Sequence, residues 1–384
     1  MIKIEHPNID KIVGKHYEAC KRYIEPRVDF CIAFFNALAE IEYTSIQKSI
    51  LDTFGIHGSA ANSIVKPFFK EEELNAKRIT EILGGDYKMK ISNCSENLSF
   101  FQYIKENLKL IITGTPKEIS NIIYANEKGK EETEHYKMKQ DCLKKVFNYD
   151  AFVNGDLDDW NNYTLTEMLG ISVCPYCNRN WINTVQDVQN KKGTGKLTNP
   201  QLDHFFCKKE HPILRLSFYN LIPSCETCNS RLKREEEFTY GKNLHPYEKG
   251  YGEEYIFETS PNNIDACLGL NNDYEVALRR IDGNEKEITV VNNHETFKID
   301  TIYKEHGDLI SEIYRKKALL GSSYINMLKT QLGIEEDEAY KLALGSYAEE
   351  ADYKKRPFSK LTKDVATQIG LVKSTKNKDN KSLK

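Results

Sequence analysis

The sequence lacks a long hydrophobic run. No stretch of about eighteen apolar residues occurs, so we expect no membrane-spanning helix. The first residues also lack the basic and then apolar order of a signal peptide, which predicts a cytoplasmic protein. Neither sign of charge is in excess, because 54 basic and 57 acidic residues give a formal net charge of −3. This balance argues against a uniformly basic coat protein for nucleic acid and leaves a local basic patch as the alternative.

Internal repeats and long low-complexity tracts are also absent. The chain of 384 residues is 40% hydrophobic and 29% charged, a composition typical of an ordered globular protein with on the order of two or three domains. Of its ten cysteines, four form two Cys-x-x-Cys pairs. We expect the other six to be small buried hydrophobic residues of a reducing compartment: Cys20, Cys31, Cys94, Cys142, Cys207 and Cys267.

The spacing of apolar residues predicts a mainly α fold with a small α+β insert. An N-terminal helical region over 1–155 is expected to hold helices at 8–41, 44–54, 68–83, 98–110, 118–125 and 136–147, with a loop at 55–63. A module over 156–250 follows, and its polar insert at 189–200 predicts a hairpin tip or a loop.

The third expected region, 251–371, combines a β-hairpin with helices. Alternating residues at 274–281 and 286–291 flank Asp282-Gly283-Asn284, a sequence typical of a hairpin turn. Helices are expected at 297–320, 324–332 and 335–347. The last residues, 372–384, are rich in lysine and polar groups and predict a basic flexible tail.

The two Cys-x-x-Cys pairs predict a metal site. Cys174, Cys177, Cys225 and Cys228 offer four thiolates, and a gap of two residues lets both sulfurs of a pair reach one ion. Because the protein would fill all four positions of a tetrahedral ion, we expect structural Zn²⁺. Iron and a redox-active cysteine pair are the alternatives.

Between the two pairs lie Asp203-His204 and Asn220, and Asn229 follows the last cysteine. A lone Asp-His pair is more often structural. This stretch, however, resembles the zinc-bracketed branch of the HNH endonucleases, the ββα-metal nucleases. In that branch a Cys-x-x-Cys leads to Asp-His, then to Asn-Leu, and then to Cys-x-x-Cys-Asn with a basic residue soon after. The resemblance covers roughly sixty residues and implies a ββα-metal module clamped by zinc.

The resemblance implies a role for each of these residues. His204 would be the general base that takes a proton from water, and Asn220 would hold His204 or its loop in place. Asp203 and Asn229 would together bind a catalytic Mg²⁺ or Mn²⁺ that stabilises the charge on the scissile phosphate. His245 is an alternative third histidine of the site, against a role in loop packing.

Basic residues near the cysteines could contact a phosphate backbone. Arg179, Arg231 and Lys233 are the candidates, and Lys233 lies where the family has its basic residue. The alternative is a solvated surface with the acidic run at 235–237 as counter-charges.

A second resemblance is carried by 162–170 and 355–364, which are similar to bacterial HNH proteins that accompany an AAA- or SMC-like ATPase. Such pairs occur in the Septu antiphage system and in some retrons, so an ATPase partner and an antiviral defence role are implied. Alternatively, the helical regions simply cover the nuclease core. Double-stranded DNA is the family's usual substrate, and RNA or tRNA is the alternative. A non-catalytic zinc module that binds nucleic acid or scaffolds a complex is the competing class.

Overall fold

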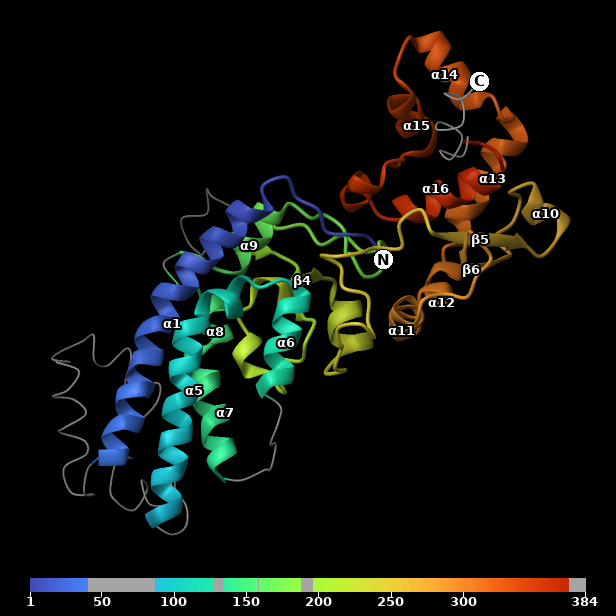
Figure 1. Cartoon of the computed structure of the whole chain (residues 1–384). Coiled ribbons are helices and arrows are strands. Elements are labelled where there is room, and N and C mark those ends of the chain that lie inside the picture. Colours follow the sequence, from blue (N-terminus) through green and yellow to red (C-terminus); the bar gives the residue numbers. More distant parts are fainter. Residues whose placement is uncertain (41–86, 127–133, 158, 188–195, 373–384) are drawn as a thin grey trace, which may run out of the picture. The chain divides into compact units, whose positions relative to one another are not determined.

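Figure 1 shows the computed structural model, which describes residues 1–40, 87–126, 134–157, 159–187 and 196–372. The described chain is mainly α-helical with small two-stranded sheets, which confirms the predicted class. It divides into two compact units. The helical unit comprises Asn8–Met168 and His204–Leu221, and the cysteine unit comprises Met1–Pro7, Leu169–Asp203 and Ile222–Lys384. The region boundaries expected after residues 155, 250 and 371 stay a prediction.

Two long helices build the core of the helical unit. α1 (Ile9–Glu40) packs against α5 (Tyr87–Thr113), and their apolar faces meet where Phe35 stacks on Phe101 with ring centroids 5.7 Å apart. These helices confirm the predictions for 8–41 and 98–110, and Pro26 lies inside α1. The helices expected at 44–54 and 68–83, and the loop between them, lie outside the described residues.

Shorter helices complete this unit, and their ends follow from local capping. α6 (Pro116–Asn126) and α7 (Glu134–Val146) confirm the helices expected at 118–125 and 136–147. α6 begins with a reciprocal capping box between Thr115 and Glu118. α8 (Tyr149–Asn154) is capped by the Asn148 side chain, and α9 is Asn162–Leu169. Two single 3₁₀ turns follow at Pro212–Leu214 and Phe218–Asn220.

Short strands lie between the two cysteine pairs in the sequence. β1 (Val185–Gln186) pairs with β2 (Lys196–Thr198) in an antiparallel hairpin, so part of the polar insert is a strand, and 188–195 lie outside the described residues. β3 (Gln201–His204) pairs with β4 (Leu221–Ser224). A π-helix over Thr227–Lys233 comes next in the sequence. The order in this stretch is therefore strand, strand, helix.

The predicted hairpin at 274–291 is wrong. β6 (Tyr274–Arg280) is a strand, but its antiparallel partner is β5 (Tyr255–Pro261), which precedes it. The other half of the predicted hairpin belongs to α11 (Ile288–Phe297), whose residues are buried at helical spacing: Val290, Asn293, His294 and Phe297. The alternation that indicated a strand covered only a few residues, whereas the helical period continues through the whole of α11.

Helices dominate the rest of the cysteine unit. The single helix predicted at 297–320 is wrong, because α12 (Ile299–Lys304) and α13 (Gly307–Leu320) are separate helices. Lys298, with a left-handed φ of 48°, separates α11 from α12. α14 (Tyr324–Leu332) and α15 (Glu336–Leu344) confirm the two later helices. The remaining elements are α10 (Ile264–Cys267), a 3₁₀ helix (Glu350–Lys355) and α16 (Ser359–Gln368), which packs on β5.

The expected tail over 373–384 lies outside the described residues, and Val372 is the last residue described. Within the ranges that are described, no helix has both the length and the apolar composition needed to cross a membrane.

Candidate metal centre and catalytic residues

Four cysteine side chains of the cysteine unit gather in one buried cluster. The sulfur atoms of Cys174, Cys177, Cys225 and Cys228 all lie within 4.8 Å of one another. Four sulfurs at such distances match the closed tetrahedral arrangement of structural zinc sites. In the part of the chain that the structure describes, no second group of three or more His, Cys, Asp or Glu side chains comes this close. The cluster can therefore hold a zinc ion, as the cysteine spacing predicts.

Local turns and donors orient these sulfurs. Asn178, directly after the first pair, has a φ of 47°, and its N–H donates to the carbonyl of Cys174 at 2.8 Å. Asparagine tolerates this left-handed conformation better than most residues. The side-chain amide of Asn180 donates to Sγ of Cys225 at 3.2 Å, and the N–H of Cys228 donates to the same sulfur at 3.5 Å. Donors of this kind stabilise a thiolate, which is the form that binds metal.

The protonation of the cluster also suits a cation. Burial raises the pKa of the Cys174 thiol well above its usual value. Hydrogen bonds from neighbouring thiols, that of Cys174 first, lower the pKa of Cys225 far below its usual value. The sulfurs therefore hold their protons unequally when no ion is present. A zinc ion replaces the remaining protons and offsets the charge of four buried thiolates.

The first cysteine pair is fixed by a segment from the far end of the sequence. The Asn178 side chain accepts a hydrogen bond from the N–H of Lys360 at 3.1 Å and donates to the carbonyl of Tyr353 at 3.0 Å. The carbonyl of Asn178 accepts from the N–H of Phe358 at 2.6 Å. Part of the stretch 355–364, which carries the second resemblance, thus has an internal role beside the metal centre.

Asp203 lies in a closed environment within the cysteine unit. Its Oδ1 is 3.0 Å from Nζ of Lys233, and both side chains are only 2% exposed. Its Oδ2 accepts a hydrogen bond from the Tyr176 hydroxyl at 2.6 Å. Tyr176 lies between the two cysteines of the first pair and stacks on Phe297, with ring centroids 4.4 Å apart. Both carboxylate oxygens are therefore occupied by groups of the chain itself.

This arrangement does not fit a divalent cation bound by Asp203 and Asn229. A Mg²⁺ or Mn²⁺ ion needs open carboxylate oxygens and room for water ligands. Asp203 has neither as the structure places it, and the Asn229 amide donates to Oε1 of Gln201 at 2.9 Å. The predicted catalytic metal therefore has no open site at these two residues in the arrangement described.

His204, the next residue along the chain, is part of the helical unit. Its ring is 7% exposed and lies edge-on to Tyr149, with centroids 4.7 Å apart. Its Nε2 is 3.0 Å from the carbonyl oxygen of Arg215. Because a carbonyl only accepts, Nε2 must carry the proton, and Nδ1 of the neutral ring then carries the lone pair.

Asn220 fixes the loop that follows His204. Its Oδ1 accepts from the N–H of Phe206 at 2.7 Å, and its Nδ2 donates to the carbonyls of Phe206 at 3.2 Å and Leu214 at 2.9 Å. The Asn220 side chain is fully buried. Its amide ties together the two ends of the loop that carries Arg215, the residue whose carbonyl contacts the His204 ring.

The remaining candidates differ in exposure. Lys233 is buried against Asp203, so it is not at a surface where a phosphate could reach it. Arg231 is exposed and pairs with Glu226 at 3.0 Å, a contact of small energy that leaves the side chain able to bind elsewhere. Arg179 is half-buried beside His306. His245 is buried, and its Nδ1 accepts from the N–H of Tyr247 at 3.3 Å, which closes its own turn.

His16, which the sequence pattern does not single out, joins three parts of the helical unit. The Trp160 Nε1–H donates to Nδ1 of His16 at 2.9 Å, so Nε2 carries the ring proton and donates to the carbonyl of Leu216 at 2.8 Å. His16 is wholly buried. The available signal was its place on α1, four residues from both Ile12 and Cys20 on the apolar face.

We predict that acid destabilises the helical unit through His16. Burial lowers the pKa of His16 from 6.5 to about 4, so the unfolded chain binds the proton more tightly. The contribution of neutral His16 to the free energy of unfolding is fully present above pH 6.5 and is lost as the pH falls toward 4. At pH 4 the free energy of unfolding is lower by about 3 kcal/mol. Denaturant unfolding between pH 7 and pH 4 measures it. His16→Gln keeps a donor and an acceptor without titrating, so this variant should lack that part of the pH dependence, and an unchanged pH slope would contradict the prediction.

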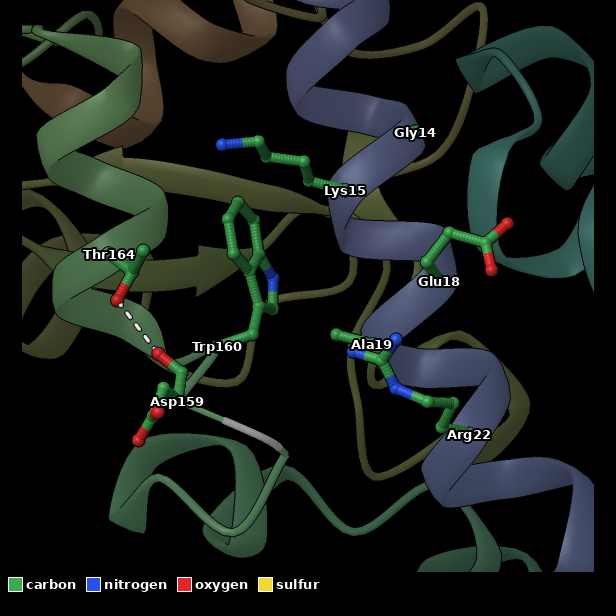
Figure 2. A pocket seen from close by; sticks show the side chains of 8 residues that line it. All are labelled: Gly14, Lys15, Glu18, Ala19, Arg22, Asp159, Trp160 and Thr164. Carbon is green, nitrogen blue, oxygen red and sulfur yellow. Dashed lines mark hydrogen bonds between the residues drawn. The ribbon is translucent and has the colours of Figure 1, made fainter.

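An open cleft of about 530 Å³ lies beside this network in the helical unit (Figure 2). Figure 2 shows the indole of Trp160 facing α1, with Lys15 and Arg22 on the helix. Glu18 and Asp159 also line the cleft, so its two basic and two acidic side chains cancel. The cleft therefore does not favour a phosphate or another anion.

Compared with known proteins, the chain matches no family model, no curated protein and no solved structure.

Proposed function

We propose that this chain hydrolyses phosphodiester bonds of nucleic acid by HNH-type chemistry. One observation carries the proposal: β3 and β4 lie between two Cys-x-x-Cys pairs whose sulfurs form one buried cluster, and the π-helix that follows begins within the second pair. Two strands between zinc ligands, followed by a helix, are the arrangement that the resemblance to HNH endonucleases implies. Asp203-His204 ends β3, and Asn229 lies in the π-helix, at the places where that family has its motif residues.

His204 is the proposed general base. The contact with the Arg215 carbonyl selects the tautomer whose lone pair is on Nδ1, and this nitrogen would take the proton from the attacking water. Asn220 would act as a positioning residue, because it holds the loop that carries the Arg215 carbonyl.

We predict that His204→Ala abolishes cleavage without loss of the fold. Positioned general bases contribute about a hundredfold or more to such rates, and the remaining activity should fall below detection in a plasmid assay. The assay compares supercoiled plasmid DNA with total tRNA, each with Mg²⁺ or Mn²⁺, at equal protein concentration. His211→Ala is the matched control, since His211 is a buried histidine of the same loop with no proposed chemical role.

The result also identifies the substrate class. Double-stranded DNA is the proposed substrate, and cutting of tRNA alone would replace it with RNA while keeping the same base. Wild-type cleavage by His204→Ala, with His211→Ala also active, would show that His204 is not the base.

A non-catalytic zinc module that binds nucleic acid is the second candidate. The specific observation in its favour is that each oxygen of the buried Asp203 carboxylate is hydrogen-bonded within the chain, to Lys233 and to Tyr176, since a pure binder needs no open carboxylate. The two functions separate in one experiment, because a binder retards nucleic acid on a gel without cutting it and is unaffected by His204→Ala.

We also propose an ATPase partner of the AAA or SMC type and a role in antiphage defence. Support comes from the resemblance at 162–170 and 355–364 alone. The cleavage assay should therefore be repeated with the purified partner and ATP. Cleavage that appears only in their presence, and is lost in His204→Ala, is the expected result for a controlled effector.

A further inference from the structure

The Asp203 carboxylate already has a cation, supplied by the chain itself. The Lys233 ammonium is 3.0 Å from Oδ1 and also lies 4.9 Å from the ring centroid of Phe238. The Tyr176 hydroxyl occupies Oδ2. A buried carboxylate without a partner is costly, so the ammonium and the phenol stabilise Asp203 where water cannot. A divalent ion would compete with Lys233 for the same oxygen.

Lys233 is the last residue of a π-helix, whose hydrogen bonds span one residue more than those of an α-helix. In the π-helix Thr227–Lys233, the N–H of Arg234 donates to the carbonyl of Asn229 at 2.8 Å, five residues back. An α-helical register would instead use the carbonyl four residues back, and one residue of register turns a side chain by roughly 100°. Such single π turns occur often at functional sites.

The two ends of this π-helix differ in how they are held. Near its start, the cysteine cluster and the bonds from Asn229 and Ser230 to Oε1 of Gln201 hold the chain. Its end passes directly into Arg234, which has a φ of 53°, a strained conformation for a residue with a side chain. The end of the helix is therefore the part that can change register while the anchored start stays in place.

We infer that Lys233 is an internal counter-ion that takes the place of a divalent cation at Asp203. With Lys233 in place the carboxylate is closed to metal, and a shift of the π-helix that withdraws the ammonium opens it. The inference rests on the proposed function, in which Asp203 is the carboxylate of an HNH site. It explains why the residues that the sequence assigns to a metal do not form an open metal site.

The test measures Mn²⁺ binding to the zinc-loaded full chain. The electron paramagnetic resonance signal of free Mn²⁺ falls as the ion binds, and it gives the affinity. Lys233→Met removes the charge and keeps the side-chain length. We expect this variant to bind Mn²⁺ at least about tenfold more tightly than wild type and to gain thermal stability from the ion. In Lys233→Met/Asp203→Asn, both effects should disappear. Equal Mn²⁺ affinity in wild type and Lys233→Met would overturn the inference.

A second variant covers the case in which Lys233→Met does not fold. Lys233→Gln can still donate a hydrogen bond to Oδ1 of Asp203 but carries no charge. Its Mn²⁺ affinity should therefore lie between the affinity of wild type and the affinity expected for Lys233→Met. Wild-type affinity in this folded variant would also overturn the inference. Cleavage assays separate this question from the proposed function. Tighter Mn²⁺ binding without cleavage, either alone or with the purified partner and ATP, supports the counter-ion and contradicts the nuclease, whereas cleavage with unchanged Mn²⁺ binding does the reverse.

Discussion

Cys225→Ser is expected to abolish zinc binding and to unfold the cysteine unit. Sγ of Cys225 lies in the four-sulfur cluster and accepts from Asn180 and from the N–H of Cys228. Serine replaces this thiolate ligand with a neutral hydroxyl on a shorter side chain, which removes a zinc ligand and weakens both hydrogen bonds. Structural zinc contributes about 10 kcal/mol or more in small domains, which matches or exceeds the usual stability of about 5–15 kcal/mol. Bound zinc per chain and thermal unfolding followed by circular dichroism measure the two effects.

Cys267→Ser is the matched control, because Cys267 belongs to the same unit and is exposed outside the cluster. This variant should keep wild-type zinc content and a wild-type melting temperature. Treating the wild type with a strong chelator should reproduce the loss seen in Cys225→Ser, and restoring zinc should reverse it. One zinc per chain and normal melting in Cys225→Ser would show that the cluster is not the zinc site.

The cysteine cluster could be predicted because its information is local. A Cys-x-x-Cys turn brings two sulfurs together whatever the rest of the chain does, so only the meeting of the two pairs depends on the fold. The long periodic helices were predictable for a similar reason. Residues such as Phe35 and Ile12 repeat at helical spacing over many turns in α1, and the period is a strong signal at that length.

The incorrect predictions concern features that depend on distant partners. The turn sequence at Asp282-Gly283 predicts a hairpin with the residues that follow it, but β6 pairs with β5, which precedes it in the sequence. The break between α11 and α12 at Lys298 required a left-handed residue that is not glycine, and composition gave no sign of it. Pairing partners and single special dihedral angles are determined by tertiary contacts, which a local pattern does not contain.

The candidate site shows the same limit. Asp203 and Lys233 were recognised separately, one as a metal ligand and one as a phosphate contact. Their ion pair joins residues that are thirty positions apart and depends on how β3 and the π-helix are placed around Tyr176. Residue type gives the charge of a side chain, but only the fold determines which opposite charge it meets.

Lys360→Met is expected to cost about 3–5 kcal/mol at neutral pH, because it leaves a buried carboxylate without its partner. Nζ of Lys360 is 2.7 Å from Oδ1 of Asp364 and donates to the carbonyl of Tyr255 at 2.7 Å, and the two charged side chains are 3% and 5% exposed. Oδ2 of Asp364 accepts from the N–H of Phe257 at 2.8 Å, so the pair also fastens α16 to β5. Chemical unfolding at pH 7 measures the change.

The loss should depend on pH in a defined direction. Burial raises the pKa of Asp364 from 3.8 to about 6 even with Lys360 beside it. Since the folded state binds this proton more tightly than the unfolded state, stability from this group is fully present below pH 3.8 and is lost as the pH rises through 6. Lys360→Met should therefore be less damaging at pH 4 than at pH 7. Lys355→Met is the control, because its partner Asp352 is partly exposed and such pairs contribute less than about 1 kcal/mol.

The double variant Lys360→Met/Asp364→Asn separates the charge from the packing. Asparagine keeps an oxygen for the N–H of Phe257 and removes the buried negative charge, so the double variant should recover most of the stability that Lys360→Met loses. Its stability should also no longer change between pH 4 and pH 7 through this position. If the double variant is as unstable as Lys360→Met, the loss comes from the packing of the lysine side chain and its bond to Tyr255, and the unpaired Asp364 carboxylate is not its cause.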